Sequence, residues 1–346
     1  MPYAPVTIPA FAVQGILSGA RSRWESQPNL IKEIVVRAGM SWDLLDEPGA
    51  RVTAEQYVRL YTLLIAALDD EAIALLSRPL RPGSFALMVR SMRGAKTIEA
   101  AVDRAAHTLT ILQDDLIFSC VREGALTGIT SELRRPDTVL PTFAHELLMR
   151  VCWRLIVWML DSGSRPKSFD FSFDRPAYAD AYEAIFPGQL LFGQSRSAAW
   201  FDSADLAGPL QRSDRDAQTF LKSAPANVIV PGLVRTGAGA RVRALLEHAM
   251  PGWPGLPDIA HDMGMSIATL QRRLARERTS FRAVKEELRR DLAITRLNTS
   301  RVPVAILAGE LGFADSATFQ RAFKIWTGNS PGRYRQREQR PATANV

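Results

Sequence analysis

The chain has 346 residues, a net charge of +7 and a hydrophobic share of 47%. This length fits two domains, and the composition is that of a globular protein rather than a disordered one. The most apolar stretch, residues 147–160, is interrupted by Arg150 and Arg154 and is shorter than the roughly 20 apolar residues of a membrane span.

The N-terminus lacks the charged and apolar regions of a secretory signal. Cys120 and Cys152 are isolated from each other in the sequence, which suits a reducing cytoplasm. We therefore expect a cytoplasmic protein that does not contact a membrane. The charge is uneven, because residues 237–346 hold 18 Lys and Arg against 10 Asp and Glu, which leaves 25 against 26 before them. A basic region joined to a neutral one is typical of a nucleic-acid-binding protein with a separate sensing or assembly domain.

The front of the chain predicts a mixed α and β domain. Apolar residues recur at helical spacing in 54–68 and 98–112. Residues 116–121 and 125–133 predict a β-hairpin around a polar, glycine-containing turn. The almost wholly apolar segment 143–160 predicts a buried helix.

Further along, the alternating segment SFDFSF at 168–173 predicts a strand with its phenylalanines on one face. A short helix is expected at 178–185, and further strands at 190–192 and 198–201. The small and proline-containing residues of 223–239 predict a linker.

The last third repeats itself. Residues 259–265 (IAHDMGM) align with 307–313 (LAGELGF), and residues 269–274 (TLQRRL) align with 318–323 (TFQRAF), at offsets of 48 and 49. The sequence of each copy predicts a short helix, a glycine-containing turn and a second helix, which is the helix-turn-helix pattern. Ser266 and Asp315 are the expected N-caps of the second helices, and the apolar pairs Leu270/Leu274 and Phe319/Phe323 are expected to pack inward. A long helix over about 281–298 joins the copies.

The second copy carries a dense, ordered set of residues. These are Ala308, Leu311-Gly312-Phe313, Asp315-Ser316, Phe319, Arg321, Phe323-Lys324, Gly328, Ser330-Pro331 and Tyr334-Arg335. With them, residues 240–337 resemble the DNA-binding domain of the AraC/XylS family of bacterial transcription regulators. Segments 10–19, 51–68 running into 78–87, and 186–210 resemble, more weakly, the arabinose-binding-type sensor domain of one branch of that family.

The resulting fold prediction is an α+β sensor domain followed by an all-α domain with two helix-turn-helix units and a connector helix. We expect a ligand-sensing and dimerisation domain at 1–222, a linker at 223–239 and the DNA-binding domain at 240–338. The resemblance implies a transcription regulator associated with the nucleoid, with promoter DNA, a small-molecule effector and RNA polymerase as partners. It also favours a homodimer and activation of transcription.

The outward positions of the two second helices are the expected DNA contacts, because Gln can pair with adenine, Arg with guanine, and small side chains can meet a thymine methyl. The predicted base contacts are Ala268, Gln271, Arg272, Ser316, Ala317, Gln320 and Arg321. The predicted phosphate contacts, which flank that reading face, are Arg273, Arg276, Lys324 and Arg335.

Several alternatives stay open. The protein could repress rather than activate, and the front domain could bind a protein or, through His107, a haem group. An enzyme is not expected, because no catalytic triad, phosphate-binding loop or metal-ligand spacing occurs, and two isolated cysteines cannot form a metal cluster. We expect no cofactor and no metal. The effector and its binding residues are not indicated by the sequence.

Overall fold

The structure is a computed structural model that describes residues 6–45, 47, 49–160, 164–230, 237–277 and 279–338. The chain divides into two compact units. One, the sheet unit, contains residues 14–34 and 58–232. The other, the helical unit, contains residues 1–13, 35–57 and 233–346. The fold is thus mixed α and β in the first and mainly helical in the second, as the sequence predicts at this level.

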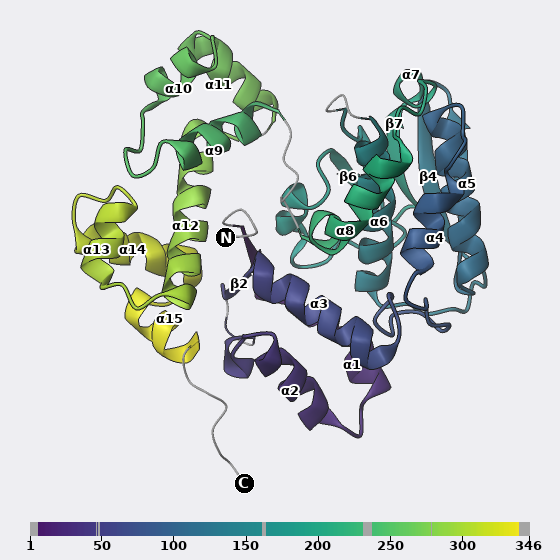
Figure 1. The fold of residues 1–346 in the computed structure, drawn as a ribbon, viewed down its shortest axis with the longest axis horizontal. Coiled ribbons are helices and arrows are strands. Elements are labelled where there is room, and N and C mark those ends of the chain that lie inside the picture. The colour runs from purple at the N-terminus through teal and green to yellow at the C-terminus, as the bar shows by residue number, and fades with distance from the viewer. Residues whose placement is uncertain are drawn as a thin grey trace. The chain divides into compact units, whose positions relative to one another are not determined.

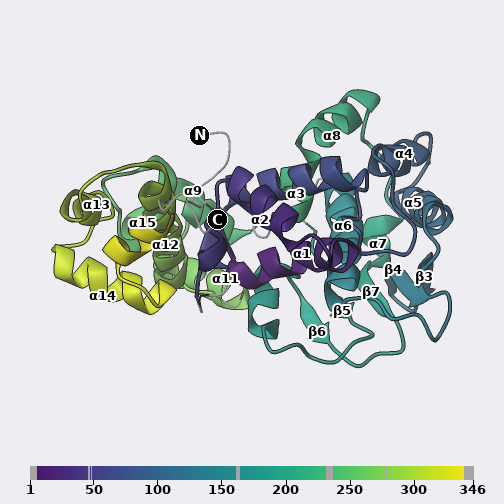
Figure 2. The ribbon, with the colours of Figure 1, turned by 90° about the horizontal axis from the view of Figure 1, so that it is seen from below.

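The sheet unit is built on one five-stranded sheet with the order β3-β4-β7-β5-β6 (Figure 2). β5 and β6 are parallel and the other pairs are antiparallel. The strands are β3 (Leu116–Glu123), β4 (Leu126–Leu133), β5 (Ser168–Asp170), β6 (Gln189–Leu191) and β7 (Ser197–Asp202). The predicted hairpin is confirmed as β3 and β4. The predicted strand at 168–173 is shorter than expected, although Phe169 and Phe171 are both fully buried.

Helix α5 packs against β3 and β4, and α6 packs against β4 and β7. The helices of this unit are α1 (Ala10–Arg23), α2 (Pro28–Arg37), α3 (Ala54–Leu68), α4 (Ser84–Ser91), α5 (Ile98–Leu112), α6 (Thr142–Leu160), the 3-10 helix η2 (Ala179–Ala184), α7 (Ser203–Leu206) and α8 (Asp214–Ile229). The first residues of α1 and α3 and the last residues of α2 belong to the helical unit. Most side chains of α6 are buried, as its apolar sequence predicts. In the described part of the chain, every helix is too short or too polar to cross a bilayer.

Helix α8 differs from the sequence-based expectation, because residues 223–229 are helical rather than part of a linker. Ser213 and Asp216 form a capping box that starts the helix. Phe220, Ala224 and Val228 follow at intervals of four and are buried, so burial of one face offsets the hydrogen bond lost at a proline within the helix. Residues 231–236 of the predicted linker lie outside the described residues.

The carboxyl end of α8 is held by two arginines of α6. Arg150 donates from its Nη1 atom to the carbonyl of Ile229 over 2.8 Å, and Arg154 donates from Nε to the carbonyl of Asn227 over 2.8 Å. Basic side chains at a helix C-terminus satisfy carbonyls that have no helical donor and favour the negative end of the helix dipole. Burial and the charge of Arg150 lower the pKa of Arg154 to about 10, which still leaves it charged at neutral pH.

The helical unit combines a short two-stranded ribbon with seven helices described in its C-terminal part. Its elements are β1 (Thr7–Pro9), η1 (Trp42–Leu44), β2 (Arg51–Thr53), α9 (Ala238–His248), α10 (Leu256–Asp262), α11 (Ile267–Arg276), α12 (Phe281–Thr299), α13 (Val304–Glu310), α14 (Ser316–Thr327) and α15 (Pro331–Glu338). β1 and β2 pair in antiparallel fashion and both pack against α12. The N-terminal ribbon thus belongs to the same compact unit as the C-terminal helices.

A buried polar network joins the ribbon to these helices. The carboxylate of Asp291, on α12, accepts from Thr7 Oγ1 over 2.6 Å and from Arg243 Nη2 over 3.0 Å. Arg51 Nε donates to Thr7 Oγ1 over 2.7 Å, and the carbonyl of Arg51 accepts from the Tyr334 hydroxyl. Burial, together with the charge of the nearby Arg290, lowers the pKa of Arg51 to about 10. Each buried charge in the network therefore has an opposite charge or a hydrogen bond, as burial requires.

Candidate nucleic-acid interface

Two helix pairs of the helical unit share the same turn. In the pair α10–α11, the amide of Gly264 donates to the carbonyl of His261 and the next amide donates to that of Ala260. In the pair α13–α14, the corresponding bonds run from Gly312 to Gly309 and from the next amide to Ala308. Both glycines have a positive φ, 65° and 71°. This is the Schellman motif, in which a left-handed glycine ends one helix and sets the direction of the next segment.

The second helix of each pair is capped in the same way. The side chain of Ser266 accepts from the amide of Thr269 at the start of α11, and Asp315 accepts from the amide of Thr318 at the start of α14. Both caps are the residues that the sequence suggests. The hydrogen bonds from Thr318 hold the pKa of Asp315 below its usual value. Both helices therefore begin at a fixed residue, which fixes which side chains face outward.

Helix α11 buries one face and exposes the predicted reading face. Leu270 and Leu274 are buried against the unit. Ala268, Gln271 and Arg272 are exposed, and they are three of the residues predicted to contact bases. The helix is thus strongly amphipathic, with its polar side turned to solvent.

Helix α14 repeats this arrangement with aromatic residues on the inner face. Its inward rings, Phe319 and Phe323, are fully buried. The predicted base-contacting residues here are Ser316, which is partly exposed, and Ala317, Gln320 and Arg321, which are exposed. Gln320 Nε2 donates to Ser316 Oγ over 3.2 Å, and Arg321 Nη2 donates to Thr318 Oγ1 over 3.1 Å. Both of these bonds lie within α14, and the side chains of Gln320 and Arg321 are exposed to solvent.

The predicted phosphate contacts fall into two groups. Arg273, Arg276 and Lys324 are exposed at the flanks of the two reading faces. Arg335, on α15, is only partly exposed, and its Nη2 atom donates to the carbonyl of Val302 in the segment between α12 and α13. Its guanidinium therefore already has a structural role in the helical unit.

Sequence reasoning missed a cluster that connects the two helix pairs. Trp253, in the loop before α10, donates from Nε1 to the carbonyl of Glu310 at the end of α13 over 2.8 Å. The guanidinium of Arg289, on α12, lies 4.9 Å from the Trp253 ring centre and 4.8 Å from that of Phe313. The ammonium of Lys285 lies 5.8 Å from the same tryptophan ring. This stacking holds both pairs against α12, which runs between them (Figure 1).

The signal for that cluster was weak. A tryptophan within the turn-forming segment PGWPG at 251–255 is unusual, but nothing in the sequence shows that it reaches a turn some 60 residues later. A second missed residue is Ile267, which aligns with Ser316 in the repeat and is 42% exposed at the start of α11. An isoleucine in this place offers an apolar surface to a thymine methyl.

The two turn glycines provide a matched pair of variants. A Cβ on Gly264 would meet nothing within 4 Å, whereas a Cβ on Gly312 would lie 2.6 Å from the Trp253 ring. Gly264→Ala should therefore cost about 1–2 kcal/mol of unfolding free energy for the left-handed backbone alone. Gly312→Ala should add an overpacking cost of about 1–3 kcal/mol. Hydrogen exchange of the amides of α13 and α14 measures the difference, and equal effects of the two variants would contradict the packing role of Trp253.

His107, which the sequence raised as a haem ligand, is exposed on α5. It is not among the residues that line the apolar cavity between α3, α4, α5, α6 and α8. A haem iron ligand lies in a pocket that encloses the group, so the described surroundings of His107 do not favour this alternative.

Comparison with known proteins gives two family matches. Residues 31–210 match the family described as "Arabinose-binding domain of AraC transcription regulator, N-term", and residues 259–337 match the family described as "Helix-turn-helix domain". The first covers more than half of the chain. The second begins within α10 and covers α11, α12, α13 and α14 in full.

Individual relatives agree with these matches. The "Ornithine utilization regulator" of Pseudomonas aeruginosa is 24% identical over 85% of this chain and 87% of that protein. The "Transcriptional activator NphR" of Rhodococcus sp is 32% identical over 40% of this chain and 44% of that protein. Among solved structures, the transcriptional regulator CdpR from Pseudomonas aeruginosa aligns over 82% of this chain and 87% of that chain, with 22% identity and a TM-score of 0.28. Because the first family match alone spans more than half of the chain, the chain belongs to the AraC family of DNA-binding transcription regulators.

Proposed function

We propose that the protein is an effector-responsive transcription activator that reads DNA with two helix-turn-helix units, α10–α11 and α13–α14, joined by the connector α12. The observation that carries this proposal is the recurrence of exposed Gln–Arg pairs, Gln271-Arg272 and Gln320-Arg321, after turns with the same glycine hydrogen-bond pattern. Units spaced by a rigid helix can enter successive major-groove segments on one face of the duplex, about 34 Å apart. One chain would then cover a site of about two turns.

The exposed residues have different proposed roles. The Gln–Arg pairs, together with Ala268, Ser316 and Ala317, contact base edges, since their side chains lie on the reading faces. Arg273, Arg276 and Lys324 contact phosphates beside them. Arg335 joins the second group through donors that its bond to Val302 leaves available.

The domain boundaries are part of the same proposal. We place the DNA-binding domain at 240–338 and the sensor and dimerisation domain at 1–222, with the ribbon β1–β2 of the latter packed on α12 of the former. The family description and the relative named a transcriptional activator support a small-molecule effector and activation through RNA polymerase. Transcription from a selected promoter with purified polymerase, with and without the protein, tests the direction of regulation.

Arg321 and Lys324 form a matched pair for the DNA test, because both are exposed cations on α14. A binding site is first selected from a pool of random duplexes. Arg321→Ala should then cost about 1–3 kcal/mol of binding free energy on that site and relax its sequence preference at one base pair. Lys324→Ala should weaken binding to selected and random duplexes alike and reduce the salt slope by about 1.

The outcomes separate the roles clearly. An equal loss for Arg321→Ala on selected and random duplexes would assign Arg321 to a phosphate. Failure of the wild-type chain to enrich any sequence from the pool would contradict the proposal as a whole.

A further inference from the structure

The sheet unit contains a cavity of about 230 Å³. It lies between α3, α4, α5, α6 and α8 and the segment that follows α3. Leu109, Leu147, Leu148 and Val228 contribute to its largely apolar lining. A single water occupies only about 10–15 Å³ of such volume, and protein interiors are otherwise close-packed. An apolar space of this size is therefore suited to a small organic molecule rather than to one or two waters.

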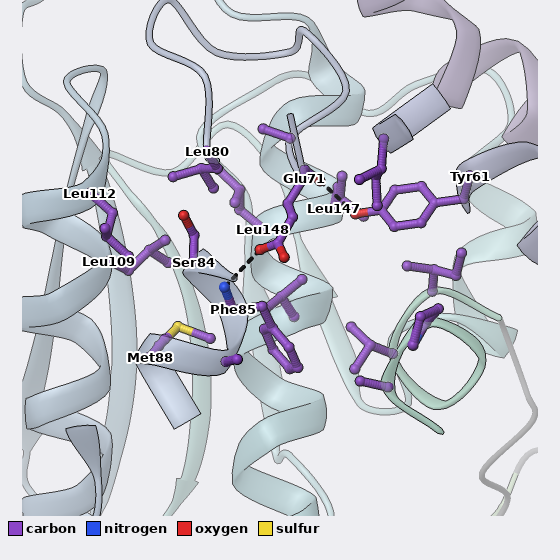
Figure 3. Close-up of a pocket in the computed structure, with 18 of the residues that line it drawn as sticks. Tyr61, Glu71, Leu80, Ser84, Phe85, Met88, Leu109, Leu112, Leu147 and Leu148 are labelled. Atoms are coloured by element: carbon purple, nitrogen blue, oxygen red, sulfur yellow. Dashed lines mark hydrogen bonds between the residues drawn. The ribbon is translucent and has the colours of Figure 1, made fainter. Parts of the chain in front are cut away.

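Three polar side chains line this cavity, those of Tyr61, Glu71 and Ser84 (Figure 3). The Tyr61 hydroxyl donates to the carbonyl of Glu71 over 2.7 Å, and the Ser84 hydroxyl donates to the carbonyl of Arg81 over 2.7 Å. The Glu71 carboxylate accepts from the amides of Gly83 and Phe85 over 2.7 Å each. A carboxylate offers about four lone-pair positions and a hydroxyl offers two, so the Glu71 carboxylate and the Ser84 hydroxyl can still accept hydrogen bonds from a ligand.

The charge of the lining also favours a ligand that donates hydrogen bonds over an anionic one. Glu71 is the charged side chain among the described lining residues, and none of them is a lysine, arginine or histidine. A ligand carboxylate would therefore face a carboxylate in an apolar space, which is unfavourable.

Helix α8 contributes a further hydrogen-bond acceptor to the cavity wall. Pro225 lacks an amide hydrogen, so the carbonyl of Leu221 loses its usual helical donor. Both residues line the cavity.

We propose that this cavity is the effector site and that its ligand is a compact apolar molecule whose polar group is a hydrogen-bond donor, an alcohol or an amine. The proposal rests on the proposed function of the front domain as a small-molecule sensor. The donor of the ligand bonds to Glu71 or Ser84, and its apolar body fills the space between α5, α6 and α8. Because α8 is the last helix of the sheet unit before α9 in the chain, a ligand against this wall contacts the segment that leads to the DNA-binding domain.

Three probes that share a phenyl ring and differ in their polar group test which polar group the cavity prefers. These are 2-phenylethanol, 2-phenylethylamine and phenylacetate, titrated into the full chain by calorimetry without DNA. The alcohol, the amine or both should bind at least about tenfold more tightly than the acid, which corresponds to about 1.4 kcal/mol. If 2-phenylethanol binds more tightly than 2-phenylethylamine, the ligand's donor is neutral. If the amine binds more tightly, the donor is charged. Tighter binding of phenylacetate, or binding of none of the three, would overturn the proposal.

Substitutions on α8 test the location. Ala224 lines the cavity and is 5% exposed, whereas Ala217, two turns earlier on the same helix, does not line it. Ala224→Leu should reduce probe affinity at least about tenfold by filling the space, and Ala217→Leu should leave affinity unchanged. Unchanged binding by Ala224→Leu would place the ligand elsewhere.

Ser84→Ala provides a second variant if the leucine disturbs folding. It removes one acceptor from the lining and should weaken the better donor probe severalfold, without changing the weak binding of phenylacetate. An equal effect on both probes would contradict a hydrogen bond to Ser84. These titrations contain no DNA, so a negative result in them does not bear on DNA binding by the helical unit. Likewise, a selection that enriches no duplex does not bear on ligand binding in the cavity.

Discussion

Asp291→Ala is expected to destabilise the helical unit by about 3–5 kcal/mol, because it removes the buried carboxylate that pairs with the buried guanidinium of Arg243. Asp291 is 1% exposed and Arg243 is 4% exposed. The same carboxylate also accepts from Thr7 of the N-terminal ribbon. Without this carboxylate, the Arg243 guanidinium and the Thr7 hydroxyl lose the acceptor that they share in a buried site.

Hydrogen exchange of α12 in the full chain measures this effect, because its amides report the opening of the unit. Glu247→Ala is the matched control, since Glu247 is the other carboxylate of Arg243, at 2.9 Å from Nε, and its side chain is 29% exposed. That variant should cost less than about 1 kcal/mol. Similar exchange rates in the two variants would show that the buried pair does not hold the ribbon on α12.

Asp70→Ala should be the most damaging single substitution in the loop that follows α3. The carboxylate of Asp70 accepts from the amides of Ala72, Ala74 and Leu80 at 2.7–2.8 Å, and Asp70 is 2% exposed. Each amide left without an acceptor costs about 1–3 kcal/mol, so a loss of about 3 kcal/mol or more is expected. The loop also carries Glu71 into the cavity lining, and probe binding should fall with it.

The neighbouring Asp69 supplies the control. It pairs with Arg81 over 2.6 Å, but both side chains are more than half exposed, so the pair should contribute less than about 1 kcal/mol. Because Asp69 has a φ of 53°, asparagine is the suitable replacement, since it tolerates this conformation. Urea unfolding of Asp70→Ala and Asp69→Asn, followed by circular dichroism, should differ by at least about 2 kcal/mol. A difference near zero would show that the loop does not depend on the buried carboxylate.

Local patterns predicted the helical unit well in its C-terminal part. The repeat located both glycine turns, both caps and the inward pairs Leu270/Leu274 and Phe319/Phe323, all of which the structure shows. These features depend on residues within one or two helical turns of each other, so the sequence order contains the needed information. The DNA contacts themselves stay predictions, supported by exposure.

The end of the front domain was less predictable, and α8 shows why. The segment SAPAN at 223–227 has the composition of a loop. Tertiary packing overrides this local preference, because the helix buries Ala224 and Val228 and receives Arg150 and Arg154 at its last carbonyls. Those arginines come from a helix more than 70 residues earlier. Short-range patterns cannot show such a partner.

The sequence by itself determined the class of the protein, because the repeated turn, caps and exposed Gln–Arg pairs are local and dense. Only the tertiary structure decided which distant segments share a core. It placed Thr7 on Asp291, 284 residues away, and Trp253 on the turn of the second helix pair. It also brought five helices together around the cavity. Contacts of this kind depend on complementary shape and on the pairing of buried polar groups, which no periodicity along the chain encodes.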